Sequence, residues 1–396
     1  MTLYMDLIDV DRITEVLSEL VRIPSVNPGF PGGTGERQVA VYVRQFFERL
    51  ALSVDVQTVE AGRDNVIGTL LGRGDRHLLW EAHMDTVQTS GMTIDPFSAD
   101  VRDGKLFGRG ACDTKASLAA MLVALETMVQ HKLIPAAHVH LAAVVDEETT
   151  YKGVSALADR VRSGELRYDA AIVGEPTRLH PIIAHKGVLR FRVEVIGVAA
   201  HSSTPEQGAN AIESMAEVIA WLRQHARESF PNRSHALTGP PSLCISMIEG
   251  GVAPNTVADR CTISIDIRTV PGQEWEDVWS ELRERILLLP MPIGVKVEVQ
   301  RPFLTDYAME VSPDHPLTHT LLAAANTYSA GREAIGAPYC SDASKLTRVS
   351  VPAIVFGPGN ISEAHTADEW VELAEVAKAA AILIHTAMHY GEEDEN

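Results

Sequence analysis

The chain of 396 residues is long enough for two or three compact units, each with its own apolar core. Apolar residues make up 45% of the sequence and charged residues 22%, which is the composition of a globular protein and argues against extensive disorder. The formal net charge of −19 argues against a nucleic-acid partner, because binding to phosphates relies on clusters of Lys and Arg.

The N-terminal segment and the cysteines favour a cytoplasmic location. The segment MTLYMDLIDVDRITEV has neither a basic start nor a long apolar core, so it does not read as a secretory signal. No stretch reaches the roughly 18 apolar residues that a membrane span needs, and we expect no membrane partner. The cysteines are scattered without a CxxC pair, which favours reduced thiols over disulfides. They are Cys112, Cys244, Cys261 and Cys340.

Helix-like and strand-like segments alternate over the first 185 residues. Apolar residues recur at helical spacing in 11–23 and 37–51, and VDVQTV, NVIGTLLG and HLLWEAHMD are predicted strands. A helix is predicted over 117–132, followed by the strands HVHLAAVVD and YDAAIVGEP. The apolar runs lack alternation, which is typical of central strands covered on both faces. This order predicts an α/β sheet with helices on its faces.

The pattern then changes to that of a smaller domain. RFRVEVIG alternates apolar and polar residues, as expected for a sheet with one solvated face. A helix over 209–228 follows, then the strands SLCISMIEGG and RCTISIDIRTV, the helix EWEDVWSELRERILLL and the strand VKVEVQ. This order is βαββαβ, the ferredoxin-like unit. We therefore predict a domain of residues 186–300 inserted between the two parts, 1–185 and 301–396, of a larger one.

Acidic residues and a histidine lie at the ends of three apolar strands. HLLWEAHMD contains His83 and Asp85, LAAVVDEE ends in Glu147 and Glu148, and AAIVGE ends in Glu175. In open α/β sheets, ligands bind beyond the carboxyl ends of the strands, so these groups can share one crevice. Neighbouring carboxylates repel one another and leave water only if they are compensated, so a cation is expected there.

Two further residues lie where they could join the same crevice. Asp113, in GRGACDTKAS, directly precedes a predicted helix, and His365, in GPGNISEAHTADEW, follows the strand PAIVFGPG. Each group also has an ordinary explanation: Glu147 and Glu148 as a solvated strand end, the histidine of HMD as a core residue, and Asp113 as a helix N-cap. One metal site accounts for all of them more economically than separate explanations do.

The ordered set of motifs resembles a known family. HMDTV, GRGACDTKAS, VVDEET, IVGEPT, the inserted βαββαβ segment and AHTADE are together similar to the dinuclear metallohydrolases of the M20 group. That group includes acetylornithine deacetylases, succinyl-diaminopimelate desuccinylases, aminoacylases and relatives of glutamate carboxypeptidase. The resemblance covers nearly the whole chain. It implies a mixed, largely parallel sheet of the zinc-exopeptidase type with helices on both faces, and an inserted domain that serves as lid and dimerisation domain.

The resemblance also implies the ligands of two divalent metal ions. Asp113 would bridge the two ions, His83 and Glu175 would complete one site, and Glu148 and His365 would complete the other. This set of nitrogen and oxygen ligands suits zinc, with cobalt and manganese as alternatives. The family pattern further implies a cis peptide bond after Asp113, which is rare for a bond that does not precede proline.

The catalytic roles that the resemblance implies fall on three residues. Glu147 would act as general base, taking a proton from water and delivering it to the departing amine. Asp85 is two residues from His83 and on the same side of the strand, and would orient that imidazole. His201, in AAHSSTPEQGANAI, would reach across a dimer interface to stabilise the oxyanion.

Four residues are candidates for binding the substrate. Asn255 and Arg268 lie in GGVAPNTVADRCTISIDIR at positions that contact the substrate in the family, where an arginine fork grips a carboxylate. Without the resemblance they would be a turn asparagine and a surface arginine. YCSDASKL resembles a substrate-side loop, which places Ser341 and Asp342 near the pocket without an assigned role.

The predicted function is a metal-dependent amide hydrolase that removes the acyl group from an N-acyl amino acid. The first alternative is an M20 metallopeptidase that acts on dipeptides or removes a C-terminal residue. An alternative of another class is a non-catalytic relative that binds a metabolite, but no ligand or base is missing from the motifs. A serine hydrolase is disfavoured because GVSAL lacks the last glycine of a nucleophile elbow. We expect a small N-acyl amino acid or short peptide as substrate and a homodimer as the active form.

Overall fold

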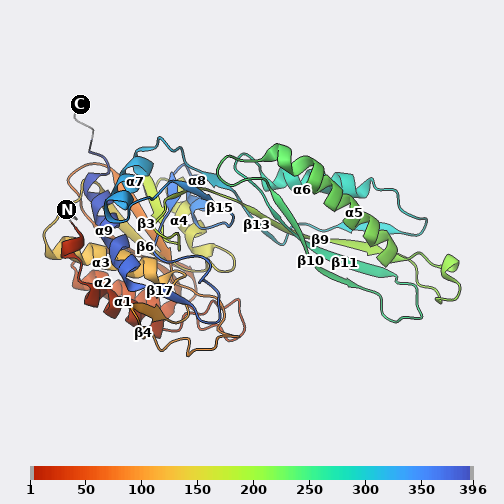
Figure 1. Ribbon diagram of the computed structural model, residues 1–396, viewed down its shortest axis with the longest axis horizontal. Coiled ribbons are helices and arrows are strands. Elements are labelled where there is room, and N and C mark those ends of the chain that lie inside the picture. Colours follow the sequence, from red (N-terminus) through yellow and green to blue (C-terminus); the bar gives the residue numbers. More distant parts are fainter. Residues whose placement is uncertain (1–3, 393–396) are drawn as a thin grey trace. The chain divides into compact units, whose positions relative to one another are not determined.

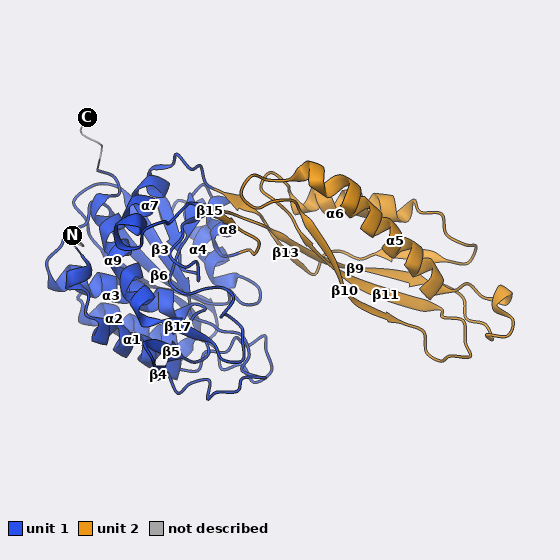
Figure 2. Cartoon of the chain, in the orientation of Figure 1, with its two compact units in different colours: residues 1–183, 311–335, 341–396 blue, residues 184–310, 336–340 orange. Residues whose placement is uncertain are grey.

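The computed structural model describes residues 4–392, which divide into two compact units (Figure 2). Their bounds are 1–183, 311–335 and 341–396 for unit 1, and 184–310 and 336–340 for unit 2. Unit 2 extends past the predicted insert of 186–300 at both ends and also takes in a short returning segment. No helix among the described residues is both long and apolar enough to cross a membrane.

Unit 1 is built around one mixed β-sheet. Its strands are β1 (Ser53–Glu60), β2 (Arg63–Leu70), β3 (His77–His83), β6 (His138–Val144), β7 (Ala170–Val173), β16 (Ala353–Val355) and β8 (Ile182–His185), which leads into unit 2. They lie in the order β1-β2-β6-β3-β7-β16-β8. The four central strands, β6, β3, β7 and β16, are parallel, and the remaining pairs are antiparallel. The prediction of a mixed, largely parallel sheet is therefore confirmed.

Helices cover both faces of this sheet (Figure 1). They are α1 (Val10–Arg22), α2 (Arg37–Arg49), α3 (Lys115–Gln130), α4 (Lys152–Arg162), α7 (Pro316–Tyr328), α8 (Ala343–Thr347) and α9 (Leu373–His389), after a short η1 (Met5–Leu7). Gly68 and Asn65 on β2 show which helices lie on which face, because residues three positions apart on a strand point to opposite faces of the sheet. A Cβ on Gly68 would lie 2.6 Å from the Phe47 ring of α2, whereas the Asn65 amide donates to the Gly153 carbonyl of α4 at 2.8 Å.

The helices on the α2 side form a second packed layer. Arg12 of α1 lies over the Phe46 ring of α2, and α1, α3, α7 and α9 pack on one another. α3 is buried nearly all round, since it lies between the sheet and α1 and α9. On the other face, α8 packs against α4 and the strands β7 and β16. A small separate sheet has the order β17-β5-β4 and is made of β4 (Asp100–Arg102), β5 (Lys105–Phe107) and β17 (Trp370–Glu372).

Unit 2 is an antiparallel sheet with two helices on one face. Its main elements, in chain order, are β9 (Val188–Ile196), α5 (Ala211–Ser229), β10 (Ser242–Gly250), β11 (Arg260–Arg268), α6 (Trp275–Leu287) and β12 (Lys296–Val299). The sheet order β10-β11-β9-β12 with antiparallel neighbours is that of a ferredoxin-like unit, so the predicted βαββαβ order is confirmed. Alternation places Phe191, Val193 and Val195 in the core with α5 and α6, and Arg192 on the open face.

Short elements complete unit 2 and its ends. They are η2 (Pro205–Gln207), η3 (Phe230–Arg233), β13 (Leu304–Asp306), β14 (Met309–Glu310) and β15 (Ile335–Ala337). β13 adds to β9 beyond the ferredoxin-like order, and β14 pairs with the part of β8 that belongs to unit 2. These added pairings explain why the second unit continues past residue 300.

Candidate metal centre

Three neighbouring parallel strands bring the predicted ligands of unit 1 to one edge of the sheet. β6, β3 and β7 lie side by side and run in the same direction, so their carboxyl ends meet. His83 is the last residue of β3, Glu147 and Glu148 follow β6, and Glu175 follows β7. Ligand sites of open α/β sheets lie at this edge.

The two carboxylate oxygens of Asp113 face two different groups of side chains. Asp113 Oδ1 is 3.0 Å from His83 Nε2, which in turn lies 3.7 Å from Glu175 Oε1. Asp113 Oδ2 is 3.2 Å from His365 Nε2, which in turn lies 3.2 Å from Glu148 Oε1. The five side chains therefore form two sets of three possible metal ligands, and Asp113 belongs to both sets.

The spacing of these atoms fits two divalent metal ions. In a tetrahedral site with bonds of about 2.1 Å, neighbouring ligand atoms lie about 3.4 Å apart. The measured nitrogen-to-oxygen distances in the two sets run from 3.0 to 3.7 Å. Each set offers one imidazole nitrogen and two carboxylates, a combination that suits zinc and also cobalt or manganese.

Burial and neighbouring charges shift the pKa values of the clustered side chains. Burial raises the pKa of Glu147 and Glu175 well above the ordinary value. Burial and the charge of Asp113 raise the pKa of Glu148 to about 7. Burial alone would lower the pKa of His365, but its hydrogen bonds to Asp113 and Glu148 raise that pKa to about 11. The carboxylates thus favour positive charge among them, which bound metal ions would supply.

Metal loading is expected to release protons. Burial would lower the pKa of His83, but Asp113 and Asp85 raise it, and the pKa of His365 is raised as well, so both imidazoles of protein stripped of metal should hold a proton more tightly than exposed ones. Each imidazole must lose its proton before Nε2 can bind a metal ion, so metal affinity should fall as the pH falls. Calorimetric metal titrations in two buffers of different protonation enthalpy should show proton release, because the imidazoles and the carboxylates with raised pKa, Glu148 and Glu175, lose protons on becoming ligands. A binding heat that does not change with the buffer would contradict this.

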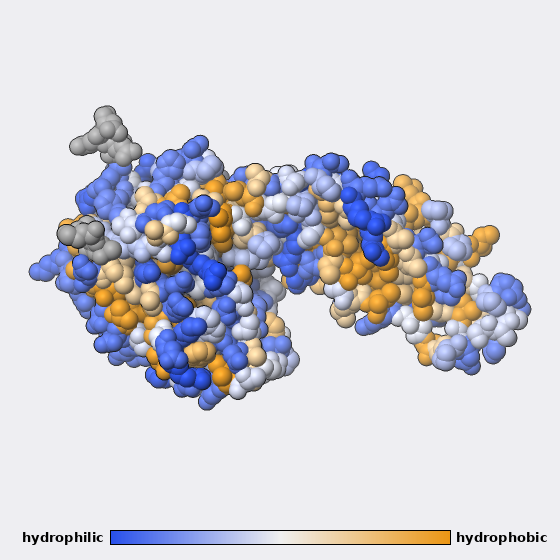
Figure 3. Space-filling model, in the orientation of Figure 1, coloured by the Kyte–Doolittle hydropathy of each residue, from blue (hydrophilic) through white to orange (hydrophobic). Residues whose placement is uncertain are grey.

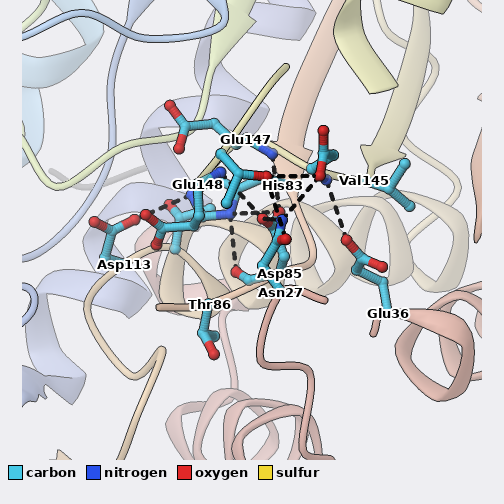
Figure 4. A network of polar contacts seen from close by, with 12 residues as sticks. Asn27, Glu36, His83, Asp85, Thr86, Asp113, Val145, Glu147 and Glu148 are labelled. Atoms are coloured by element: carbon cyan, nitrogen blue, oxygen red, sulfur yellow. Dashed lines mark hydrogen bonds and ion pairs between the residues drawn. The ribbon is translucent and has the colours of Figure 1, made fainter. Parts of the chain in front are cut away.

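The Asp85 carboxylate holds the loop that carries Glu147 and Glu148 (Figure 4). The main-chain N–H of Glu147 donates to Asp85 Oδ1 at 3.1 Å, and that of Glu148 donates to Oδ2 at 3.0 Å. His83 Nδ1 lies 3.0 Å from the main-chain oxygen of Asp85 and 3.5 Å from its carboxylate. His83 Nδ1 therefore faces both the main-chain oxygen and the carboxylate of Asp85, and the same carboxylate also secures the neighbouring loop.

A buried ion pair holds the loop that carries Asp113, and sequence reasoning did not single it out. Glu369 Oε1 accepts hydrogen bonds from the main-chain N–H groups of Cys112 and Asp113, at 2.9 and 3.0 Å. Glu369 Oε2 pairs with the Arg109 guanidinium at 2.6 Å. The peptide bond between Asp113 and Thr114 is cis, as the family pattern implied. Arg109 lies in the motif GRGACDTKAS and Glu369 in AHTADEW. Both are charged residues without a role among the predicted ligands, and this could have marked them in the sequence.

A second missed residue, Glu81, lies beside the metal centre on β3. It is two residues before His83, so its side chain is on the same face of the strand. Burial and the nearby charge of Asp342 raise the pKa of Glu81 well above its ordinary value. Asp342 also raises the pKa of Glu147, and Ser341 beside it is fully buried. Asp342 therefore lies near the metal centre. For Glu81, the sequence offered one sign of a special role, since it is an acid inside the apolar run LLWEAH.

The other predicted site residues belong to unit 2. His201 is exposed, with Nδ1 2.7 Å from Ser203 Oγ, and the main-chain N–H of Ser202 donates to the Asn255 carbonyl at 3.0 Å. Arg268 ends β11, and its side chain pairs with Asp266 at 3.0 Å. Unit 2 therefore brings His201 and Asn255 together near the N-terminal end of β11. Arg268 lies at the C-terminal end of the same strand.

Comparison with known proteins agrees with this fold and cluster. A model of the family described as peptidase family M20/M25/M40 matches residues 79–389. Acetylornithine deacetylase from Photorhabdus laumondii is 31% identical over 385 residues, which cover 95% of this chain and 96% of the relative.

Two solved structures share the fold at lower identity. An aminopeptidase from Bacillus cereus has a TM-score of 0.79 at 21% identity, covering 98% of this chain and 100% of that one. An M20 family metallo-carboxypeptidase from Sulfolobus solfataricus has a TM-score of 0.77 at 19% identity, covering 96% of this chain and 99% of that one. Together with the family match, these findings lead to one conclusion: the chain belongs to the peptidase family M20/M25/M40 and is a metallohydrolase that acts on amide bonds.

Proposed function

We propose that the protein removes the acyl group from an N-acyl amino acid, with two zinc ions held by the two ligand sets. The observation that carries this proposal is the placement of Asp113, whose two oxygens face separate ligand sets beside Glu147. Bound metal ions would supply positive charge that polarises the scissile carbonyl and makes water more acidic. The acyl substrate is favoured by the 31% identity to an acetylornithine deacetylase over nearly the whole chain.

Glu147 is proposed as the group that moves the proton. Its carboxylate lies within 4.8 Å of ligand atoms of His83 and Glu148, but it belongs to neither set that contains Asp113. Burial raises its pKa, which gives the carboxylate a higher affinity for a proton than an exposed one has. Glu147 takes a proton from the water that attacks the acyl carbon. As the carbon–nitrogen bond breaks, the same proton passes to the departing nitrogen. The hydroxyl of the attacking water stays on the acyl carbon, so a carboxylic acid and a free amine remain.

Short peptides are the alternative substrates, because a peptide bond is an amide that the same residues could hydrolyse. The two solved peptidases give little support to peptide substrates, since at 19% and 21% identity they show the fold alone. One more or one fewer methylene in a pocket changes preference only modestly, so the acyl class needs a direct test.

A substrate panel tests the proposal. Zinc-loaded and cobalt-loaded protein would be incubated with acetyl, succinyl and formyl amino acids and with dipeptides, and the released amine would be measured. Hydrolysis of one acyl class, abolished by a chelator, is the expected result. Hydrolysis of dipeptides alone would replace the deacylase with a peptidase, and no hydrolysis by protein that holds two metal ions would overturn both.

We also propose that two copies share their active sites through unit 2. Arg268 and the pair of His201 and Asn255 lie at opposite ends of β11, a separation of about 27 Å for a strand of this length. An amino-acid-sized substrate cannot contact both ends of one copy. If all three residues bind the substrate, as the family pattern implies, a second copy must supply one end.

The edge strand β10 offers a surface for such a contact. It is the outermost strand of its sheet, and Met247 and Ile248 on it are 56% and 58% exposed. Val252, just beyond it, is 84% exposed. An unpaired strand edge beside apolar side chains is a template for pairing with another chain. Apolar residues also gather on the visible face of unit 2 around α5 and α6 (Figure 3).

Mixing two inactive variants tests the shared site. His201→Ala and Glu147→Gln copies should each be inactive alone, and together they should form dimers in which one site has both residues intact. With random pairing in a two-fold dimer, about one quarter of wild-type activity should return. No recovery after subunit exchange, or a fully active monomer in sedimentation, would contradict the shared site.

A further inference from the structure

We propose that Asn27, Arg63 and Asp146 form a clamp that positions Glu147 and Glu148, and this proposal rests on the function proposed above. The three residues lie outside the two ligand sets, and they come from a loop after α1, from β2 and from the turn after β6. Asn27 is labelled in the network of Figure 4, and its side chain donates to Asp146, which in turn accepts a hydrogen bond from Arg63.

The clamp holds a backbone conformation that a side chain normally disfavours. Asp146 has a φ of 72°, in the left-handed region, which is uncommon for residues other than glycine although aspartate tolerates it better than most. This turn ends β6 and lets the main-chain N–H groups of both following residues point to Asp85. The Asp146 carboxylate is buried and accepts hydrogen bonds from Asn27, Arg63, Thr149 and Thr150, and in this proposal these bonds hold the conformation.

Arg63 fixes the Asp146 carboxylate to the sheet. Its guanidinium donates to Asp146 Oδ1 at 2.8 Å and to both oxygens of the buried Glu36. Glu36 Oε1 also accepts the main-chain N–H of Asp146 at 3.2 Å. Both the side chain and the main chain of Asp146 are therefore tied to one Arg–Glu pair on neighbouring elements. Thr149 and Thr150 add hydrogen bonds from their hydroxyls to the same carboxylate.

Asn27 joins the two carboxylates that define the loop. Its side-chain amide nitrogen donates to Asp85 Oδ2 at 2.7 Å and to Asp146 Oδ1 at 3.0 Å. Asn27 is fully buried, and its own carbonyl oxygen accepts the main-chain N–H of Gly29 at 2.8 Å. An amide group suits this place because it presents two N–H donors between two acceptor-only groups.

The consequence is that the base and one metal ligand share a single support. Asp85 accepts the main-chain N–H groups of Glu147 and Glu148, and Arg63 anchors Asp146, which directly precedes them in the chain. Asn27 joins the carboxylates of Asp85 and Asp146. Loss of the clamp should therefore misplace Glu147 for proton transfer and weaken the ligand set of Glu148. The set of His83 and Glu175 stands on other strands and should be spared.

The test uses Asn27→Ala and Asp146→Asn in the full chain. Asn27→Ala removes the link, and Asp146→Asn keeps the size and the tolerance for positive φ but loses the charge that holds Arg63. Loss of a partner behind a ligand costs about 10- to 100-fold in metal affinity or activity. We expect kcat to fall by about that factor with KM within about twofold, and one of two zinc-binding steps in calorimetry to weaken by a similar factor.

Asn326→Ala serves as the matched control. Asn326 is exposed on α7, and within residues 4–392 its side chain bonds to main-chain groups of Leu322 and Arg332 alone. The clamp is overturned if both clamp variants keep wild-type kcat and zinc binding, or if they change only KM or the melting temperature. Should the wild type hydrolyse no substrate of the panel, the proposed function fails, while the zinc titrations of the variants still decide on the clamp.

Discussion

Replacement of Glu147 by glutamine is expected to lower kcat by about 10²- to 10⁴-fold while both metal ions remain bound. The amide keeps the size of the side chain but cannot accept a proton from water. Glu147 is absent from both ligand sets that share Asp113, although it also lies in a third possible group with His83 and Glu148, so we expect those two sets to keep their ions. The main-chain bond from its N–H to Asp85 remains, so the loop should keep its place.

The control for this variant is Glu165→Gln. Glu165 is an exposed carboxylate that follows α4 and pairs with Arg160, so its loss should change kcat little. Metal content would be measured by elemental analysis on the protein used for the kinetics. A Glu147→Gln enzyme with a wild-type rate would exclude the role of base, and loss of one metal ion would instead make Glu147 a ligand.

Replacement of Asp113 by alanine is expected to remove both metal ions and all measurable hydrolysis. Each set of three ligands includes one oxygen of Asp113, so the substitution leaves each set with one imidazole and one carboxylate. The main-chain N–H of residue 113 still donates to Glu369, so the loop should fold. The measurement is metal content after equilibration with a slight excess of zinc, with circular dichroism as the check on folding.

Two further substitutions separate the sets, and a third is the control. Glu175→Ala and Glu148→Ala should each remove one metal ion, because each residue belongs to only one of the sets that contain Asp113. Asp100→Ala, at an exposed carboxylate on β4, should remove none. An Asp113→Ala protein that still binds one zinc ion per chain as tightly as the wild type would show that the two sets do not share this residue.

Sequence reasoning could predict the strands and the edge of the sheet where the site lies. His83, Glu148 and Glu175 each follow an apolar run, and parallel strands place such residues at one edge. The start of the βαββαβ unit could be predicted as well, because continuous apolar runs give way there to strands in which apolar and polar residues alternate. Asp113 and His365 lie on loops, where the spacing of apolar residues does not show which way a side chain points. Their place in the site could therefore be predicted only from the family resemblance.

The contacts that support the site could not be predicted, because they join segments far apart in sequence. Arg63 meets Asp146 across 83 positions, and Arg109 meets Glu369 across 260. Strand alternation does place the Asp85 side chain on the same face as His83. It cannot show that the Asp85 carboxylate bonds to the loop of Glu147 while the main-chain carbonyl meets the imidazole.

The most direct test of the account is a titration of metal-free protein with zinc, followed by both calorimetry and hydrolysis of the best substrate of the panel. The arrangement around Asp113 predicts no hydrolysis before metal is added and saturation of binding at two ions per chain. Saturation at a single ion, or hydrolysis that persists in metal-free protein, would contradict the two-metal amide hydrolase.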